Sequence, residues 1–285
     1  MKLKEVLDKT IQFYRDRKFE NPRLEAEWLF ASALKLDRVQ LYLKFDQPLA
    51  EPELNRLREM IRRRTAGEPL SYITGSRGFY GYEFEVTPDV LIPRPETETL
   101  VEKALEKLKA LHGDSLRALD LGCGSGCIGL TLAKKEPRLQ VDLVDVSEKA
   151  LQVAKRNAQS LMVEERCQFF HEDALQFLEK SVSHYDVIVA NPPYIRPGDM
   201  QVEDHVKKFE PELALYAPEG TSKLKAWSQA AVSKLSDQGI MLMEMGHDQG
   251  PEMKQHFQTL KRFQNVEVIR DLSQHDRVIL GELHG

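Results

Sequence analysis

From Pro95 to the C-terminus, short apolar segments alternate with segments whose apolar residues recur at helical spacing. Such alternation predicts βαβ units, and therefore a mostly parallel sheet covered by helices. The apolar segments predict seven strands, at Leu116–Leu121, Leu139–Val144, Cys167–His171, Tyr185–Ala190, Gly239–Met243, Val266–Arg270 and Arg277–Leu280. The helical spacing predicts helices at Thr97–Lys109, Ile128–Lys135, Glu148–Leu161, Ser222–Leu235 and Asp248–Thr259. The last two strands are joined by too few residues for a parallel crossover, so we expect them to form an antiparallel hairpin.

The first 77 residues show almost no strand-like alternation. Apolar residues such as Leu7, Ile11 and Tyr14 recur at helical spacing instead, and we place Trp28 in the core of these helices. Residues 78–95 combine aromatic and β-branched residues with Gly and Pro, which favours a short hairpin. We therefore divide the 285 residues into a helical domain at 1–77, a β-hairpin connector at 78–95 and an α/β domain at 96–285.

The composition argues against several classes of protein. Hydrophobic residues make up 41%, but no stretch approaches the roughly 20 apolar residues of a membrane span, and the N-terminus lacks the apolar core of a signal peptide. A net charge of −5 disfavours a general nucleic-acid binder. The three cysteines and eight histidines have no metal-ligand spacing. We expect a soluble, cytoplasmic monomer with reduced thiols, no metal and no specific nucleic-acid binding.

A glycine-rich loop follows the first predicted strand of the α/β domain and opens a helix. Gly122, Gly124 and Gly126 let the backbone turn tightly and approach a ligand. Asp145 follows the next strand, where a carboxylate can accept hydrogen bonds from both ribose hydroxyls. Ligands of open α/β sheets bind at the carboxyl ends of the strands, so the loop and the acid together predict a nucleoside-cofactor site.

The spacing of the loop favours one cofactor. A dinucleotide site requires G-x-G-x-x-G, whereas this loop reads G-x-G-x-G and is preceded by Asp120, which would repel a pyrophosphate. A carboxylate there suits the amino group and sulfonium of S-adenosylmethionine, whose demethylated product is S-adenosylhomocysteine. We expect Cys123, Ser125 and Val146 to line the same site.

A third acidic residue, Asp173, follows the third predicted strand. Its carboxylate could accept a hydrogen bond from an adenine amino group, with Ala174 beside the ring. An exposed Asp that caps a helix is the alternative explanation, and the sequence leaves both open.

Asn191, Pro192, Pro193 and Tyr194 immediately follow an apolar strand of the same predicted sheet. The two prolines end the strand and stiffen the turn. An amide nitrogen is a poor nucleophile because its lone pair is delocalised. Its two N–H groups can be held by the side-chain oxygen of Asn191 and the carbonyl of Pro192, which would aim the nitrogen at a methyl donor and stabilise developing positive charge. The ring of Tyr194 can stack on the planar amide, so we predict that this turn carries the catalysis.

Both motifs, in this order and spacing, resemble those of methyltransferases that modify exocyclic amino or amide nitrogens, and most closely those of the HemK-like release factor glutamine N5-methyltransferases. Further segments are similar to that family: residues 67–75, 79–81, 91–98, 145–147, 209–211 and 244–249. With the helical module, the resemblance covers essentially the whole chain.

The resemblance implies a Rossmann-like class I methyltransferase domain, preceded by a helical domain that recognises the substrate or partner. It implies that the three loop glycines and Asp145 bind S-adenosylmethionine, with Asn191 as a further contact. It implies that residues 191–194 grip the substrate, which in this family is the glutamine of the Gly-Gly-Gln motif in bacterial-type peptide release factors. Arg94 and Glu96 are implied to lie near the amino-acid end of the cofactor or at the substrate entrance.

Two surface segments are open to more than one interpretation. Residues 205–216 form either part of a substrate lid or a plain surface loop. Arg62, Arg63 and Arg64 end a predicted helix, where solvated charges are common, and contact with an RNA or an acidic partner is the alternative.

Three other functions are alternatives. A DNA adenine-N6 methyltransferase would apply the Asn-Pro-Pro-Tyr chemistry to a flipped base, although this chain lacks a basic excess. A non-catalytic adaptor would bind a release factor or ribosomal components through the helical module without transferring methyl groups. A nicotinamide oxidoreductase would bind a dinucleotide in place of the methyl donor.

Overall fold

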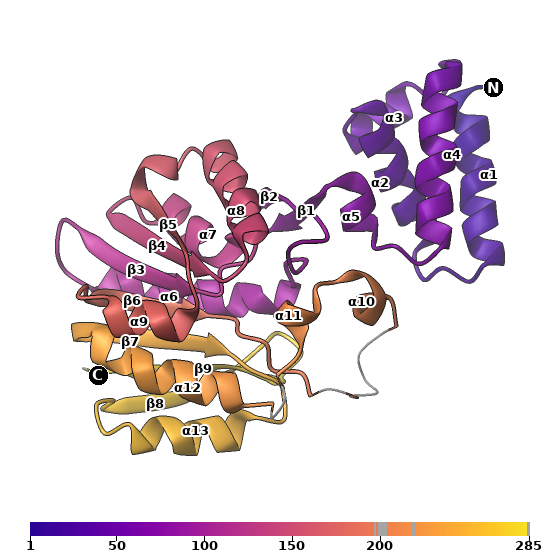
Figure 1. The fold of residues 1–285 in the computed structure, drawn as a ribbon. Coiled ribbons are helices and arrows are strands. Elements are labelled where there is room, and N and C mark those ends of the chain that lie inside the picture. Colours follow the sequence, from indigo (N-terminus) through magenta and orange to yellow (C-terminus); the bar gives the residue numbers. More distant parts are fainter. Residues whose placement is uncertain (197, 199–203, 218–219, 284–285) are drawn as a thin grey trace. The chain divides into compact units, whose positions relative to one another are not determined.

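The structure is a computed structural model that describes residues 1–196, 198, 204–217 and 220–283 (Figure 1). The chain forms two compact units. Met1–Ser76 and Asp204–Phe209 make up the first, which we call the helical unit. Arg77–Glu203 and Glu210–Gly285 make up the second, which we call the sheet unit. Within the described ranges, no helix combines the length and apolarity that crossing a membrane requires.

The helical unit encloses its own apolar core. Its helices are α1 (Leu3–Asp16), α2 (Pro22–Leu34), α3 (Arg38–Leu43), α4 (Glu51–Thr65), α5 (Leu70–Thr74) and α10 (Asp204–Phe209). Leu7, Tyr14, Phe30 and Leu57 are all buried in one cluster, which is the expected result of apolar residues at helical spacing. A Cβ placed on Gly67 would lie 3.7 Å from the ring of Phe209, so α10 packs beside the turn that follows α4.

Two expectations for this unit need correction. Trp28 is 43% exposed, so its placement in the core is wrong. The cause is the helix face: α2 turns Leu29 and Phe30 inward and leaves Trp28 on the outer side. Of the arginines that end α4, Arg62 is exposed as expected, but Arg64 is not simply solvated, because it donates to Glu25 at 2.6 Å and lies over the ring of Phe19.

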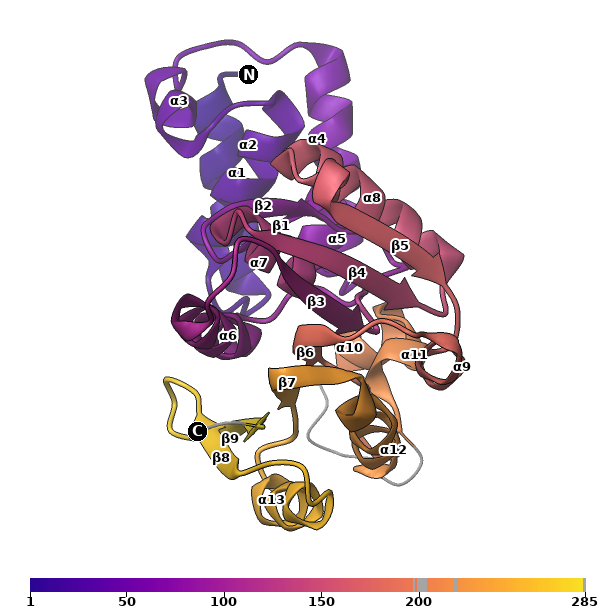
Figure 2. The same ribbon diagram turned by 90° about the vertical axis from the view of Figure 1, so that its left-hand side faces the viewer.

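The sheet unit begins with a hairpin of β1 (Ser76–Phe79) and β2 (Tyr82–Glu85), followed by a seven-stranded sheet of order β5-β4-β3-β6-β7-β9-β8 (Figure 2). The strands of that sheet are β3 (Leu116–Leu121), β4 (Leu139–Asp145), β5 (Cys167–His171), β6 (Tyr185–Ala190), β7 (Leu235–Glu244), β8 (Asn265–Arg270) and β9 (Asp276–Glu282). The first five pair in parallel, and β9 runs antiparallel to both β7 and β8. The predicted fold class, with its C-terminal antiparallel hairpin, is confirmed.

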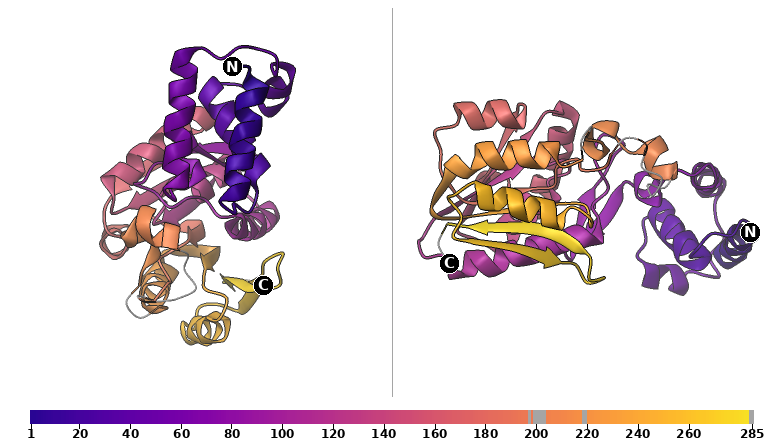
Figure 3. Two further views of the ribbon diagram at one scale, coloured as in Figure 1. Left: turned by 90° about the vertical axis from the view of Figure 1, so that its right-hand side faces the viewer. Right: turned by 90° about the horizontal axis from the view of Figure 1, so that it is seen from below.

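Helices cover both faces of this sheet. They are α6 (Glu98–Ala110), α7 (Cys127–Lys135), α8 (Glu148–Leu161), α9 (Ala174–Lys180), α12 (Ser222–Ala231) and α13 (Gly250–Thr259). The unit also contains the short helix α11 (Glu212–Leu215) and the 3-10 turns η1 (Pro95–Thr97), η2 (Glu164–Arg166) and η3 (Val232–Lys234). Successive residues of a strand face opposite sides, so Ala118 packs in the core beneath α6, α7 and α8, whereas Leu119 packs in the core beneath α9, α12 and α13 (Figure 3). Two hydrophobic cores, one on each face, hold the strand ends in place.

Most predicted boundaries differ from the observed ones by one or two residues, but two differences are larger. Helix α12 ends at Ala231 and strand β7 begins at Leu235, so the prediction of a helix through Leu235 is wrong. Leu235 pairs with Tyr185 of β6 across an irregular register, which extends the strand through the polar residues 236–238. Helix α9 was not predicted as a helix, because its seven residues are too few to show a clear helical period.

Candidate functional site

The parallel register brings three chain segments to one edge of the sheet. Leu121 at the end of β3 pairs with Val144 on one side and with Ala190 on the other. Gly122 and Asn191, which follow β3 and β6, therefore lie beside Asp145, the last residue of β4, at the carboxyl ends of three adjacent strands. This edge is where ligands of open α/β sheets bind.

The glycine loop is fastened to Asp145 by hydrogen bonds. The backbone N–H of Gly124 donates to Oδ2 of Asp145 at 2.8 Å, and the N–H of Ser147 donates to Oδ1 at 2.8 Å. Gly124 has a φ of +54°, and a Cβ there would meet nothing within 4 Å, so its backbone borders open space. Burial raises the pKa of Asp145, and the hydrogen bonds from the backbone oppose that shift. Each carboxylate oxygen keeps a lone pair for a further donor.

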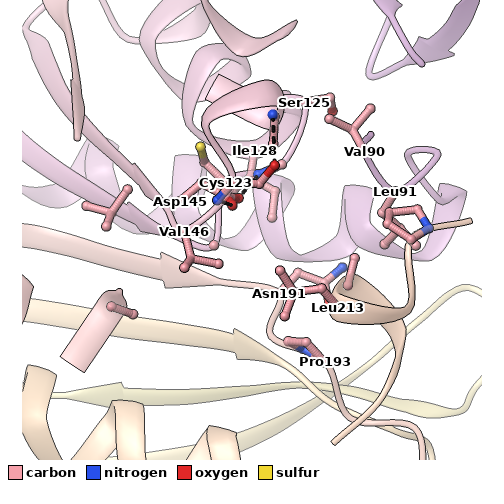
Figure 4. Close-up of a pocket in the computed structure, with 18 of the residues that line it drawn as sticks. Val90, Leu91, Cys123, Ser125, Ile128, Asp145, Val146, Asn191, Pro193 and Leu213 are labelled. Carbon is pink, nitrogen blue, oxygen red and sulfur yellow. Dashed lines mark hydrogen bonds between the residues drawn. The ribbon is translucent and has the colours of Figure 1, made fainter. Parts of the chain in front are cut away.

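A cavity of about 260 Å³ opens between the glycine loop and the turn after β6. Figure 4 shows Asp145 and Cys123 on one side and Asn191 and Pro193 across from them. Leu213, from α11, borders the same space. The walls also include the apolar side chains of Val90, Leu91, Ile128, Val146 and Ala174.

A buried polar network stands behind the turn of residues 191–194. The hydroxyl of Thr97 donates to Oε2 of Glu244 at 2.6 Å, and the hydroxyl of Tyr194 donates to Oε1 at 3.0 Å. Nδ2 of Asn191 donates to Oγ1 of Thr97 at 3.4 Å. The Tyr194 carbonyl also accepts a hydrogen bond from the side chain of Gln249 at 3.1 Å. Since Ala190 pairs with Met243 in the parallel register, the next residues along, Asn191 and Glu244, are neighbours at the strand ends.

A second buried carboxylate, that of Glu210, supports another wall of the cavity. It accepts from Nη2 of Arg94 at 2.6 Å and from the backbone N–H of Ile92 at 3.2 Å. Arg94 itself lines the cavity. The segment that follows α10 is thereby attached to the loop before α6.

Comparison with known proteins identifies the family. Residues 5–75 match the family model described as the PrmC N-terminal domain, and residues 97–210 match the model described as the methyltransferase small domain. The release factor glutamine methyltransferase of Chlorobaculum tepidum is 41% identical over 279 residues, which cover 96% of this chain and 94% of that protein. The protein of the same description from Koribacter versatilis is 38% identical over 283 residues and covers 99% and 98%.

The chain belongs to the release factor glutamine methyltransferase family. Solved structures support the fold. A SAM-dependent methyltransferase from Agrobacterium tumefaciens matches with a TM-score of 0.51 at 19% identity, covering 73% of this chain and 69% of that chain. The hMettl16 catalytic domain matches with a TM-score of 0.56 at 12% identity, covering 82% and 83%. The predicted family, and with it an S-adenosylmethionine-dependent methyltransferase, is confirmed.

The residues of the cavity fit the nucleoside part of S-adenosylmethionine. The Asp145 carboxylate holds two backbone N–H groups and retains lone pairs on the cavity side, which suits a ribose diol. Val146 and Ala174 add an apolar wall of the kind that an adenine ring needs. Gly122 has a φ of +68°, and a Cβ there would lie 3.0 Å from the indole of Trp227, so a larger residue would be strained and crowded.

Most of the residues predicted to bind the cofactor lie in the cavity wall. They are Gly122, Cys123, Gly124, Ser125, Asp145, Val146, Asp173, Ala174 and Asn191. Gly126 and Asp120 are not part of the wall. Asp120 is fully buried beneath the loop, where Oδ2 accepts from the N–H of Gly129 at 2.8 Å and Oδ1 has no partner among the described residues. Burial raises the pKa of Asp120 to about 7.

The predicted substrate residues divide in the same way. Arg94, Asn191 and Pro193 line the cavity, whereas Pro192, Tyr194 and Glu96 do not. Glu96 is exposed, and Pro192 is buried. The ring of Tyr194 packs against the core beneath α12 and α13, with its hydroxyl on Glu244. Stacking of this ring on a substrate amide stays a prediction.

Asp173 acts as a helix cap, one of the two interpretations left open. Its Oδ1 accepts from the backbone N–H groups of Leu175 and Gln176 at the start of α9. The residue also lines the cavity, so the cap does not exclude a contact with the cofactor. Of the segment considered as a lid, residues 212–215 form α11 and Leu213 lines the cavity, while residues 199–203 before it lie outside the described ranges.

Sequence reasoning missed several residues that the structure brings to the site. Three of them are Thr97, Glu244 and Glu210. Their hydrogen bonds join residues more than 40 positions apart in the chain, and no local sequence pattern predicts such pairs. Trp227 and Lys223 enter the cavity wall from α12. Their spacing of four residues on one helix was the available signal.

The cysteines and potential metal ligands add little to the site. Cys123 and Cys127 are free thiols, and burial raises the pKa of Cys127 to about 12. Cys167 is also free. Across the part of the chain that the structure describes, no group of three or more His, Cys, Asp or Glu residues is placed to hold a metal ion.

Proposed function

We propose that this chain methylates the side-chain amide nitrogen of the glutamine in the Gly-Gly-Gln motif of peptide chain release factors. Two relatives at 41% and 38% identity over nearly the full chain carry the description release factor glutamine methyltransferase. The observation that carries the proposal is that Asn191 and Pro193 line the same cavity as the glycine loop and Asp145. An acceptor for an amide and a pocket for a nucleoside thus share one space.

The turn of residues 191–194 supplies the hydrogen-bond acceptors that an amide substrate requires. Nδ2 of Asn191 donates to Thr97, which leaves Oδ1 free to accept one N–H of the substrate amide. The backbone carbonyl of Pro192, which lies between Asn191 and Pro193 of the cavity wall, would accept the other. Bound S-adenosylmethionine supplies an electrophilic methyl group on its sulfonium. Transfer would break the bond between the sulfur and the methyl carbon, leave S-adenosylhomocysteine and form the bond to the amide nitrogen. The two acceptors would stabilise the positive charge that develops on that nitrogen before it releases a proton to water.

The remaining parts of the site restrict which amide can enter. Arg94, held by Glu210, and Leu213 border the cavity and would contact the backbone that flanks the glutamine. The two glycines that precede the target glutamine have no side chains, so the substrate chain can approach such walls closely. The role of the helical unit is to recognise the rest of the release factor, which gives the enzyme a second, independent contact with its substrate.

The test is a methylation assay on an intact release factor. Purified enzyme, S-adenosylmethionine and a release factor should give the mass increase of one methyl group, located by fragmentation on the glutamine. A release factor whose glutamine is replaced by glutamate serves as the matched control and should gain no mass. Methyl transfer to duplex DNA but not to the release factor would contradict the proposal, as would binding of the release factor without any transfer.

We also propose that the enzyme acts as a cytoplasmic monomer without specific nucleic-acid binding. The three free cysteines and the net charge of −5 support this view. Light scattering coupled to gel filtration should give the mass of one chain, 32.7 kDa. A mass of two chains at assay concentration would contradict the monomer.

A further inference from the structure

Glu244 lies behind the turn of residues 191–194, at the end of β7. Its side chain is fully buried, and its two oxygens accept the hydroxyl hydrogens of Thr97 and Tyr194. Tyr194 is the last residue of the turn. Asn191 is the first, and it is linked to Glu244 through a hydrogen bond to Thr97. A single carboxylate is therefore connected to both ends of the turn.

The chemistry of these groups fixes the direction of each hydrogen bond. An ionised carboxylate only accepts, so Thr97 must donate its single hydroxyl hydrogen to Glu244. The oxygen of Thr97 is then left as an acceptor, and Asn191 must present its Nδ2 to it. The carbonyl oxygen of Asn191 consequently faces away from Thr97, toward the cavity that Asn191 lines.

We propose that Glu244 is a positioning residue for methyl transfer: through Thr97 it orients the carboxamide of Asn191 with its oxygen toward the substrate, and through Tyr194 it holds the far end of the turn. This inference rests on the proposed function, because it assigns the acceptor of the substrate amide to Asn191. Glu244 touches neither the cavity nor the reacting atoms. Its effect is exerted entirely through the hydrogen-bond direction and the position of its neighbours.

The surroundings of Glu244 make its ionisation sensitive to pH. Burial raises its pKa, while the hydrogen bonds from Thr97 and Tyr194 and the charge of Arg277 on β9 lower it. The negative charge of Glu96 on η1 raises the pKa of Glu244 further. The thiol of Cys127 on α7 also faces the Glu244 carboxyl. A protonated Glu244 can itself donate to Thr97. Thr97 can then donate to Asn191, which would favour the flipped carboxamide, with nitrogen toward the substrate.

The experiment compares steady-state methylation of an intact release factor by the wild type and by four full-length variants. Glu244→Gln replaces one acceptor by a donor, and Thr97→Val removes the hydroxyl while keeping the shape of the side chain. Both should lower kcat by about 10- to 100-fold, the usual cost of removing a group that orients a catalytic ligand indirectly. Thr97→Ser retains the hydroxyl and should keep kcat within about threefold of wild type. Glu282→Gln, at a buried glutamate on β9 that pairs with Lys107, is the matched control and should leave kcat unchanged.

Two further measurements separate orientation from general damage. Calorimetric titration with S-adenosylmethionine should give the same Kd for Glu244→Gln and Thr97→Val as for the wild type. The acid limb of the wild-type kcat–pH profile should disappear in Glu244→Gln, since glutamine does not titrate. A merely structural role for Glu244 would raise the cofactor Kd in Glu244→Gln and would leave the acid limb in place.

The outcomes distinguish this inference from the proposed function. A wild type that does not methylate the release factor overturns both. An active wild type whose kcat is matched within twofold by Thr97→Val and Glu244→Gln overturns the positioning role alone. If Glu244→Gln does not fold, Thr97→Val and Thr97→Ser decide, and equal kcat values for these two variants count against the proposal.

Discussion

Each of the two units buries a glutamate, but the two carboxylates have different neighbours. In the helical unit, Glu27 accepts from Arg38 at 2.6 Å, from Arg23 at 3.0 Å and from the hydroxyl of Tyr42. Burial raises the pKa of Glu27, yet these hydrogen bonds outweigh burial and the pKa is lowered. In the sheet unit, the donors to Glu244 among the residues that the structure describes are the hydroxyls of Thr97 and Tyr194, and the pKa of Glu244 is raised.

The difference shows how a buried charge can serve two purposes. Two guanidinium groups neutralise Glu27, so its ionised form stabilises the fold of the helical unit. No cation donates a hydrogen bond to Glu244 among the described residues, so its ionised form costs folding free energy and sets the direction of hydrogen bonds at the cavity. We infer that stability depends on the first glutamate and catalysis on the second, and the following predictions test that division.

The largest effect is expected from Asn191→Ala, which removes the acceptor that Glu244 orients. We expect kcat to fall by about 10²- to 10³-fold, or about 2.7–4 kcal/mol, as when one preorganised hydrogen-bonding group is deleted from an active site. The Kd for S-adenosylmethionine and the melting temperature should stay close to the wild-type values. Asn55→Ala, on the exposed face of α4, is the control. A full loss of cofactor binding in Asn191→Ala would mean that the residue acts in the cofactor pocket and would break the comparison.

Asp145→Ala should damage a different part of the same unit. The change removes a carboxylate that holds two backbone N–H groups at 2.8 Å and faces the cavity. Hydrogen bonds to a charged group contribute about 1.5–3 kcal/mol, so the Kd for S-adenosylmethionine should rise about 10- to 100-fold. Isothermal titration calorimetry measures this directly. Turnover at saturating cofactor should fall less than in Asn191→Ala, and the reverse order would contradict the assignment of the two residues.

Glu27→Gln should act on stability and not on turnover. It removes the charge that Arg23 and Arg38 neutralise, and because both arginines are largely exposed we expect a loss of about 1–3 kcal/mol in the free energy of unfolding of the helical unit. Urea denaturation followed by circular dichroism measures the loss. The kcat at saturating release factor should be unchanged. A tenfold drop in kcat would show that the helical unit affects the chemical step, and the division between the two glutamates would then fail.

The smallest effect, and the sharpest test of the comparison, is the dependence of stability on pH. The pKa of Glu27 is lowered in the folded state, so its contribution is present above the unfolded pKa of about 4.3 and is lost as the pH falls. The pKa of Glu244 is raised, so its relative contribution is greatest at low pH and is lost as the pH rises above about 4.3. Glu27→Gln should therefore lose its stability deficit on acidification, whereas Glu244→Gln should gain stability relative to wild type as the pH rises. Melting temperatures of each variant and of wild type, measured from well below pH 4.3 up to pH 8, should show these opposite slopes, and parallel slopes would contradict the pKa directions.

The sequence was sufficient to predict the sheet and one wall of the cavity, for a physical reason. Strands β3, β4 and β6 are rich in apolar residues, and the functional residues lie at their carboxyl ends: Asp145 is the last residue of β4, and Gly122 and Asn191 directly follow β3 and β6. Parallel pairing then brings those residues to one edge. Local order along the chain translates directly into proximity in space.

Other features depend on pairings that the sequence does not reveal. Glu244 meets Thr97 across 147 positions, and Arg94 meets Glu210 across 116. From the local sequence, the ring of Tyr194 was predicted to stack on the substrate amide, but in the structure this ring packs against the core beneath α12 and α13. The local sequence predicts that Leu235 ends a helix, but Leu235 pairs with Tyr185 of β6 and belongs to β7. In each case the deciding contact lies far away along the chain.

The helical unit is assembled from two separate stretches, and this has a consequence for how the protein is made. Residues 1–76 leave the ribosome first, but α10 and its Phe209 are translated only after most of the sheet strands. Until then the contact between Gly67 and Phe209 cannot form, so this part of the helical unit should pack late. A fragment cut after residue 76 would lack this last piece, and a fragment that starts at residue 77 would carry it without its neighbours. The two units therefore cannot be exchanged between relatives as simple consecutive blocks.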